Sequence, residues 1–596
     1  MSDTTKTRGW RGYLLLITGA GILVGLALNW LLTEPQIFNW APYEDWDEIM
    51  AYNQAAPMSL QSRFAHATYG SVEEAKFRLA KLIYKNFDSV GKHFSVPSYS
   101  NNVLDSFQQP HKIYEVRSFD ATYARGILDR RPFVIARYIT LIGSEIMLAA
   151  LCCFWTLRFG NGAWFVAVPA LWFGLSDGFI SQDTLALPNA WNVMLALIIF
   201  AALLDTIERR KHLGLYISSA LFALGLNTKI DFMFVGIPII ATWILSGLGR
   251  KDPVRAWIRS ALLSALWFVA VLVLTNPRLL YATPLVISEQ ERLLTSVNSG
   301  LPDIGYNRTQ LTRFFLGRTL GANKDLVRLH LVSVLACLAV CSLFPISVAL
   351  SSRLDVQKKW RILALLSLFY LSLWVTPVFL ARSAYDRYFL SGSAVAMVSI
   401  GYAGYYLWRE RSLLCRSVGG LIFLLCLICY LGRAKEVSIR DEWEKHIVAH
   451  GMDTRASRNQ AVLEMIRLVE SGQYANQVIT DQHSYTDIRA FLERGISVTL
   501  INSFNFEQQL RKIASTGKPV LGLYAPGEDT AEEKWEGKWD DKERARYHAY
   551  LEYLEKFQTV TQFGSKPMPL LDWAPPDADD RVVIFEVKPN ETGSLK

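Results

Sequence analysis

The chain has 596 residues, of which 51% are hydrophobic and only 19% are charged, with a net charge of +8 at pH 7. Its apolar residues gather in blocks of about 18 to 24 residues, close to the roughly 20 that cross a bilayer as a helix. This composition excludes a string of soluble domains and predicts a polytopic α-helical membrane protein. Because the basic residues concentrate between the apolar blocks, the positive charge indicates membrane topology and not nucleic-acid binding.

Eleven apolar segments are predicted to span the membrane. They are residues 13–33, 134–157, 163–180, 187–204, 213–227, 230–248, 256–275, 327–350, 361–380, 389–407 and 413–432. The first has the basic flank of a signal peptide, but it is longer than a signal core and has no evident cleavage site, which favours a retained anchor. All seven cysteines lie in or beside these segments, so packing roles are expected and a disulfide-stapled outer domain is excluded.

The charges of the short loops predict the orientation of these segments. With the amino terminus in the cytoplasm, most basic loop residues lie inside, as the positive-inside rule requires. The short outer turns then contain only Lys229, Arg382 and Arg387 as basic residues. Three large segments fall on the outer face: the first loop at 34–133, a loop at 276–326, and the tail at 433–596.

The three outer basic residues work against the orientation bias, so their placement calls for a local reason. Snorkelling or pairing with acidic residues of the loops is one explanation. The other is an anionic ligand at the outer leaflet, such as a lipid phosphate.

The first outer loop contains a compact acidic cluster, Asp45, Asp47 and Glu48. Acids in the first turn of a helix are favoured by the helix dipole, which is the structural explanation of the cluster. The functional explanation is a general base near the membrane surface, where partial burial tunes a carboxylate. The carboxylates could also hold a divalent metal, although no outer histidine is paired with them. Further along, residues 71–87 are predicted to form a helix on the membrane surface.

The other two outer segments contain further elements. Residues 287–297 have helical spacing and are expected to run along the interface. The tail is predicted to form a small α/β domain with a mostly parallel sheet, since apolar strands alternate with helical stretches. The strands are expected at 478–480, 498–501, 520–524 and 582–587, and the helices near 458–470, 485–494 and 530–557. Asp481 and His483 after the first strand could form a site, and a solvated loop explains them equally well.

The order of these features resembles the GT-C class of integral-membrane glycosyltransferases, in the branch of the protein O-mannosyltransferases and lipid A aminoarabinose transferases. The run Asp47-Glu48-Ile49-Met50-Ala51-Tyr52 is one residue longer than the usual Asp-Glu-x-x-Tyr of that branch. Gly225-Leu226-Asn227-Thr228-Lys229 is a shortened form of its Gly-Leu-x-x-x-Thr-Lys signature, and Arg387-Tyr388 matches its Arg-Tyr before a late span. Arg137 in the second span and Asn276-Pro277 after the seventh also fit.

The resemblance covers about residues 10–430, so residues 1–432 are expected to form a GT-C-like transmembrane module, followed by an extracytoplasmic α/β domain at 433–596. The chain departs from the family at the start of the fourth span. Family members often have an acid there, whereas this chain has Asn189, with Asp183 six residues earlier as the candidate second acid. The tail contains no motif of the family, so it does not indicate the acceptor.

The resemblance implies transfer of a single sugar from a polyprenyl-phosphate-linked donor to a lipid, glycan or protein acceptor on the outer face. Asp47 would deprotonate or orient the acceptor hydroxyl, with Glu48 or Asp45 in support. Lys229 and Arg387, with Arg382, would hold the departing lipid phosphate. No cofactor is required, no nucleic acid is involved, and membrane lipids surround the spans. The expected location is a bacterial inner membrane.

Two other functions are weighed against this one. A transporter or flippase would need paired charges or broken helices near the bilayer midplane, and two repeated halves. The sequence shows mainly charges at the ends of spans and no evident repeat. A non-catalytic scaffold with a partner-binding outer domain predicts instead that a change at Asp47 has no effect beyond stability.

Overall fold

The computed structural model describes most of the membrane-embedded part of the chain and the framework of the tail. The described ranges are residues 3–34, 71–86, 131–183, 189–209, 212–247, 254–276, 278–281, 304–322, 330–380, 388–449, 454–481, 494–501, 517–524, 552–563 and 582–588, with a few single residues of the tail. Asp45, Asp47, Glu48, Arg382, Arg387, His483 and the predicted helix at 287–297 lie outside them. The described residues fold as two compact units: the first contains nearly all of those up to Arg440, and the second contains those from Asp441 onward together with Arg131.

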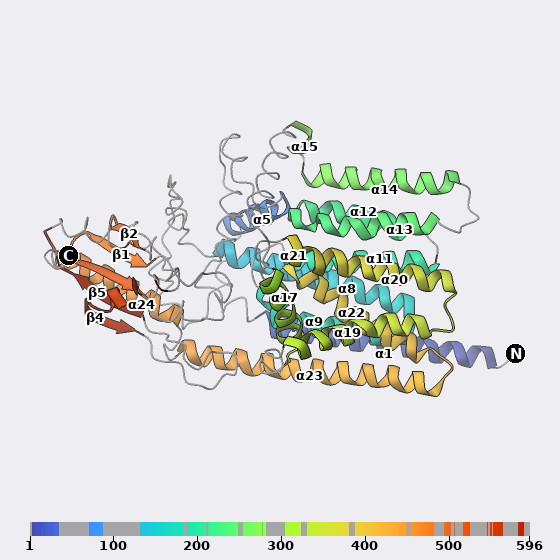
Figure 1. Ribbon diagram of the computed structural model, residues 1–596. Helices are drawn as coiled ribbons and strands as arrows, with labels where there is room; N and C mark the ends of the chain where they lie inside the picture. The colour runs from blue at the N-terminus through green and yellow to red at the C-terminus, as the bar shows by residue number, and fades with distance from the viewer. Residues whose placement is uncertain are drawn as a thin grey trace. The chain divides into compact units, whose positions relative to one another are not determined.

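Each of the eleven predicted spans corresponds to a helix of the first unit, and the long helices run side by side (Figure 1). They are α1 (Asp3–Thr33), α8 (Arg131–Phe159), α9 (Trp164–Gly174), α11 (Asn189–Arg209), α12 (Leu213–Leu226), α13 (Gly236–Gly247), α14 (Val254–Thr275), α19 (His330–Leu350), α20 (Val356–Tyr370), α22 (Leu390–Trp408) and α23 (Leu413–Ala449). By length and composition, seven helices among the described residues can cross a membrane.

Shorter elements connect or extend these helices. They are α5 (Ser71–Asn86), η2 (Gly160–Ala163), α10 (Asp177–Asp183), η3 (Ile230–Val235), α15 (Arg278–Tyr281), α17 (Ile304–Thr312), η4 (Arg313–Thr319), η5 (Leu371–Val375) and α21 (Thr376–Leu380). η2 and η3 are 3-10 turns, whereas η4 and η5 are π-helical. The π-helical η5 joins α20 to α21, so the ninth predicted span is a helix with a wider turn inside it.

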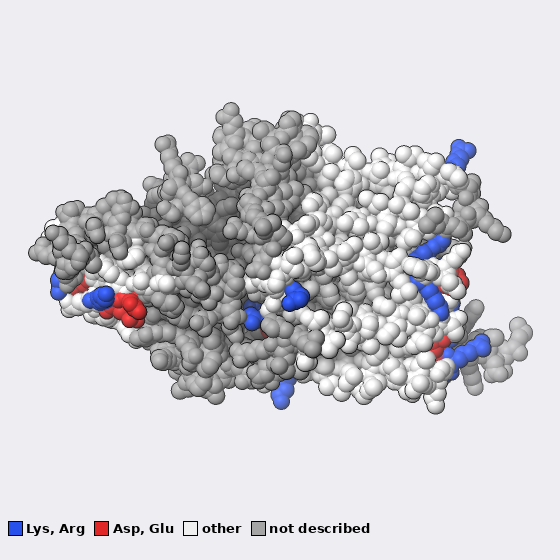
Figure 2. Space-filling view, in the orientation of Figure 1, with Lys and Arg blue, Asp and Glu red and all other residues white. Residues whose placement is uncertain are grey.

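The outward surface of the helices is apolar, which identifies a multi-pass membrane protein. In α14, Leu262 and Leu266 are 66% and 63% exposed, and Leu274 is 80% exposed. A helix with so much exposed apolar surface would be unstable in water and is stable against lipid. Figure 2 shows the same pattern, with a largely uncharged flank along the helices, charged side chains gathered at its right-hand end and further Lys and Arg side chains near its opposite end.

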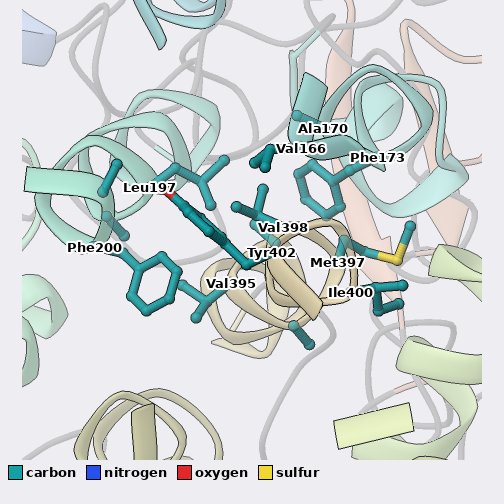
Figure 3. Packing of buried hydrophobic residues seen from close by; sticks show 14 of the residues in the cluster. Val166, Ala170, Phe173, Leu197, Phe200, Val395, Met397, Val398, Ile400 and Tyr402 are labelled. Atoms are coloured by element: carbon teal, nitrogen blue, oxygen red, sulfur yellow. The ribbon is translucent and has the colours of Figure 1, made fainter. Parts of the chain in front are cut away.

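The core of the first unit is centred on α22, which packs against α9, α11 and α19. In Figure 3, Tyr402 of α22 lies among apolar side chains of α9 and α11. Its hydroxyl accepts a hydrogen bond from Trp155 Nε1 at 3.0 Å. α22 approaches α9 closely because Gly401 has no side chain: a Cβ there would lie 2.4 Å from the carbonyl oxygen of Phe165. Small residues permit such close packing between membrane helices.

Arg433 joins α23 to the segment between α9 and α10. Its guanidinium is 7% exposed and forms ion pairs with Asp177 and, at 2.7 Å, with Glu436. Its Nε donates to the carbonyl oxygen of Leu175 at 3.0 Å. Because Asp177 opens α10, this interaction fixes the position of α10 relative to α23.

We expect Arg433→Met to destabilise the protein by about 2 kcal/mol, because Asp177 and the Leu175 carbonyl lose their partner. The expected loss is smaller than for a fully buried pair, since Asp177 is 34% exposed. Thermal unfolding in detergent micelles measures the change. Arg467→Met, which breaks an exposed pair with Glu464, is the control and should leave the unfolding temperature unchanged. Equal unfolding temperatures for Arg433→Met and wild type would contradict the prediction.

Glu410, in the turn between α22 and α23, accepts hydrogen bonds from Ser351 at 2.7 Å and Ser352 at 2.6 Å. Burial of Glu410 raises its pKa, but the bonds from the two serines outweigh this effect and hold the pKa below its ordinary value. A depressed folded-state pKa contributes stability above the unfolded value of about 4.3 that is lost as the pH falls through the folded value. We therefore expect the unfolding temperature to drop on acidification below about pH 4.3, and to drop less in Glu410→Gln. An identical drop in both proteins would contradict this role.

The second unit contains α24 (Thr454–Glu470) and a five-stranded sheet in the order β2-β1-β3-β5-β4. The strands are β1 (Gln477–Asp481), β2 (Ser497–Ile501), β3 (Val520–Tyr524), β4 (Gln558–Phe563) and β5 (Val582–Val587). β1 pairs in parallel with β2 and β3, whereas β5 is antiparallel to β3 and β4. The prediction of an α/β domain is thus confirmed, but the expectation of a mostly parallel sheet is wrong. β4 was not predicted, because an edge strand with the polar sequence QTVTQF has no apolar run.

Candidate functional site

The Gly225–Lys229 motif forms a tight turn at the end of α12. The backbone N–H groups of Thr228 and Lys229 both donate to the carbonyl oxygen of Gly225, at 3.1 and 3.0 Å. The chain then turns back so closely that a Cβ at Gly225 would lie 2.1 Å from the ring of Phe232. The Thr228 hydroxyl donates to the same Gly225 carbonyl at 2.6 Å and is hydrogen-bonded to Asn192 of α11. Glycine and threonine of the motif therefore build the turn that positions Lys229.

The ammonium group of Lys229 lies between α11 and the start of α22. Lys229 Nζ donates to Asn189 Oδ1 at 3.5 Å and lies 5.2 Å from the centroid of the Tyr388 ring, a cation–π distance. Tyr388 follows Arg387 directly in the sequence. The structure thus brings together two motif positions that are far apart in the chain, one after α12 and one before α22.

Asn189 is oriented by its own hydrogen bonds. Its Nδ2 donates to Gln182 Oε1 at 2.7 Å, so its side-chain oxygen faces Lys229. The position at which the family often has an acid is therefore occupied by an amide that contacts the lysine through a dipole. This contact leaves the lysine charge in place, whereas a carboxylate at Asn189 would neutralise it.

Asp183, the candidate second acid, ends α10 and is buried, with 1% of its surface exposed. The Ser144 hydroxyl of α8 donates a hydrogen bond to its carboxyl group. In the sequence, α10 lies between two membrane-spanning segments and outside both of them. Burial raises the pKa of Asp183 well above its usual range, although the hydrogen bond from Ser144 opposes the rise. A carboxyl group held in this way can position its neighbours, and its burial keeps it from direct contact with a substrate in solution.

Lys76 of α5 is a buried cation that the sequence did not single out. It is 3% exposed, donates from Nζ to Thr140 Oγ1 at 3.1 Å, and lies 4.8 Å from the centroid of the Trp191 ring. Trp191 in turn donates from Nε1 to the Thr140 carbonyl at 2.9 Å. The charge of Lys76 also lowers the pKa of Asp183. No sequence signal separated Lys76 from the other basic residues of the helix, because its burial depends on contacts with α8 and α11.

α5 confirms the predicted helix in the first outer loop and packs on the first unit more closely than a surface helix would. Phe77 and Ala80 are fully buried, whereas Leu79 and Leu82 are 45% and 57% exposed. Its second residue, Val72, donates from its backbone N–H to the carbonyl oxygen of Asn227 at 3.2 Å. α5 therefore begins directly at the turn that holds Lys229.

The remaining predicted site residues are distributed as follows. Arg137 of α8 is buried, with 1% exposed, and Asn276 after α14 hydrogen-bonds to Asn227. Asp481 ends β1 in the second unit. Among the described residues there is no group of three or more His, Cys, Asp or Glu side chains that could hold a metal ion. The acidic cluster with Asp47 and the arginines Arg382 and Arg387 lie outside the described residues, so their part of the site stays a prediction.

Comparisons with known proteins find a likeness at the level of structure. No protein-family model matches the chain, and no curated protein matches it. The chain is similar to the crystal structure of ArnT from Cupriavidus metallidurans bound to undecaprenyl phosphate, with 10% sequence identity and a TM-score of 0.36. The similarity covers 82% of this chain and 92% of that chain. A TM-score of 0.36 is too low to transfer residue roles between the two proteins.

Proposed function

We propose that the protein is a GT-C type glycosyltransferase that moves a single sugar from a polyprenyl-phosphate-linked donor to an acceptor on the outer face of the membrane. The observation that carries the proposal is the position of Lys229, in a motif-built turn against Asn189 and beside Tyr388. The two sequence elements that resemble the family's phosphate-binding motifs meet there. A basic site at the ends of membrane helices suits a ligand with an apolar tail and an anionic head.

The proposed reaction requires stabilisation of the leaving phosphate. When the bond between sugar and phosphate breaks, negative charge increases on the phosphate oxygens, and a fixed cation in a partly water-excluded site stabilises it. Lys229 would supply this cation, and Arg387, next to Tyr388, would supply a second, with Arg382 in support. Asp47 would act as the base toward the acceptor hydroxyl, with Glu48 and Asp45 beside it. The buried Asp183 would position Lys76 and Ser144 around the site.

The proposed arrangement in the cell follows from the charge pattern. Residues 1–432 would form the transferase module in a bacterial inner membrane, with the amino terminus in the cytoplasm. The loops at 34–133 and 276–326 and the domain at 433–596 would lie in the periplasm. No cofactor is proposed, and a divalent metal would be required only if the outer carboxylates bind one.

The test is transfer or hydrolysis of the sugar from a panel of radiolabelled undecaprenyl-phosphate sugars, including mannose, glucose and aminoarabinose, by the purified full-length protein in lipid nanodiscs. We expect release of undecaprenyl phosphate from at least one donor, dependent on added membrane extract as the acceptor source. If the protein neither binds nor processes any of the donors, the proposal that it is an enzyme is wrong. Movement of an intact lipid-linked sugar across a vesicle membrane would favour the flippase instead.

A further inference from the structure

Asn276 has a buried side-chain oxygen without a partner. The residue follows α14 and is 9% exposed, and among the described residues nothing donates a hydrogen bond to its Oδ1. A buried acceptor without a donor costs about as much free energy as a lost hydrogen bond, so each one in a native structure calls for an explanation.

The neighbouring hydrogen bonds fix which end of the Asn276 amide is the unpaired one. Asn227 Nδ2 donates to the Leu272 carbonyl at 2.9 Å and to Thr275 Oγ1 at 2.5 Å. The oxygen of Asn227 therefore faces Asn276, and Asn276 Nδ2 donates to it at 3.4 Å. A flipped Asn276 amide would set two acceptor oxygens against each other. The Oδ1 of Asn276 is thus held on the side away from Asn227.

The Oδ1 atom of Asn276 lies at the same end of the first unit as Lys229. Asn227 lies two residues before Lys229 in one turn, and its carbonyl oxygen accepts from Val72 of α5 at 3.2 Å. The end of α14, the turn after α12 and the start of α5 therefore meet around Asn227 and Asn276.

We infer that the side-chain oxygen of Asn276 accepts a hydrogen bond from a hydroxyl or amino group of the donor's sugar, and so helps to select the sugar. The inference rests on the proposed function. A donor of this kind has three parts: a hydrocarbon tail, a phosphate and a sugar. The tail has no polar hydrogen, and the phosphodiester anion is an acceptor only, so the sugar alone can donate to Asn276.

The test compares two ligands that differ only in the sugar. Affinities of the full-length protein in nanodiscs are measured for bare undecaprenyl phosphate and for the undecaprenyl-phosphate sugar that wild type binds best. We expect Asn276→Leu to weaken binding of the sugar-bearing lipid about fivefold or more, and to change binding of the bare lipid less than about twofold. No acceptor is present, so an effect of Asn276 on the acceptor does not enter the measurement.

The same substitution separates recognition from folding. Asn276→Leu removes one unpaired buried oxygen and leaves the oxygen of Asn227 unpaired instead, so the unfolding temperature should stay close to that of wild type. Ser218→Ala, which removes another buried and unpaired oxygen of α12, is the matched control and should change neither affinity. Should Asn276→Leu fail to fold, the smaller change Asn276→Ser serves the same comparison with the same expected selectivity.

The outcomes distinguish the inference from the function on which it rests. Equal weakening for both lipids, or no weakening of either, overturns the role of Asn276 and leaves the proposed function standing. An effect seen only when acceptor is added would assign Asn276 to the acceptor and also overturn the inference. A wild-type protein that binds bare undecaprenyl phosphate but none of the sugar-bearing forms overturns the proposed function and the inference with it.

Discussion

Replacement of Lys229 by methionine is expected to lower kcat/KM for transfer from a polyprenyl-phosphate sugar by about 10²- to 10³-fold, the usual cost of removing one fixed group that stabilises developing negative charge. Methionine is close to lysine in shape and removes the charge, and with it the hydrogen bond to Asn189 and the cation–π contact with Tyr388. The turn itself should persist, because Gly225 and Thr228 form its hydrogen bonds. Loss of phosphate stabilisation should lower kcat, whereas the unfolding temperature should change little.

Two variants sharpen the interpretation of Lys229. Lys229→Arg keeps the positive charge but spreads it over a planar guanidinium group, so this variant should retain more activity than Lys229→Met. Lys359→Met is the matched control at the other end of the helices, where the lysine donates to the carbonyl oxygen of Ala349 at 2.7 Å, and it should leave transfer unchanged. Wild-type activity in Lys229→Met would remove Lys229 from the site.

Replacement of Asp47 by asparagine is expected to reduce kcat by about 10²- to 10⁴-fold, the range for loss of a general base. The substitution preserves shape and removes only the negative charge, so donor affinity and unfolding temperature should be close to those of wild type. Transfer rates with saturating donor, together with the donor affinity, separate the two effects. Asp45→Asn should have a smaller effect, since Asp45 is assigned only support.

A different pattern would lead to a different assignment of the acids. If Asp45→Asn or Glu48→Gln lost more activity than Asp47→Asn, the base would be that residue. If all three variants were fully active, the cluster would be a helix cap, as the structural explanation holds. In that case the scaffold hypothesis would gain weight only if wild type also failed to transfer any sugar.

The membrane helices could be predicted from sequence because the bilayer imposes one solution. A stretch of about 20 apolar residues without water must satisfy its own backbone groups, and a helix does so locally. α22 shows that the same reasoning holds for a helix that packs mainly against protein: it contains Ser399, Tyr402 and Tyr405, and nearly all of its residues are buried.

The sheet of the second unit was predicted less completely, for a reason that lies in pairing. β1, β2 and β3 have apolar runs, so their existence and approximate bounds could be read from the sequence. β4 lies at the edge of the sheet with only exposed and half-buried residues, and its strand conformation depends on pairing with β5. The antiparallel direction of β5 likewise depends on which strand it pairs with, and this cannot be predicted from the local sequence pattern of β5.

The sequence by itself determined that this is a multi-pass membrane protein, that an acidic cluster follows its first span, and that Gly225–Lys229 and Arg387-Tyr388 each come at the end of a span. These properties follow from composition, charge and spacing, which are local. Only the tertiary structure decided that Lys229 lies against Asn189 and Tyr388, that Lys76 and Asp183 are buried, and that Asn276 keeps an unpaired oxygen. These six residues come from six different helices and turns. Their contacts depend on how the helices pack, because a buried polar group is stabilised by whichever partner the packing brings to it.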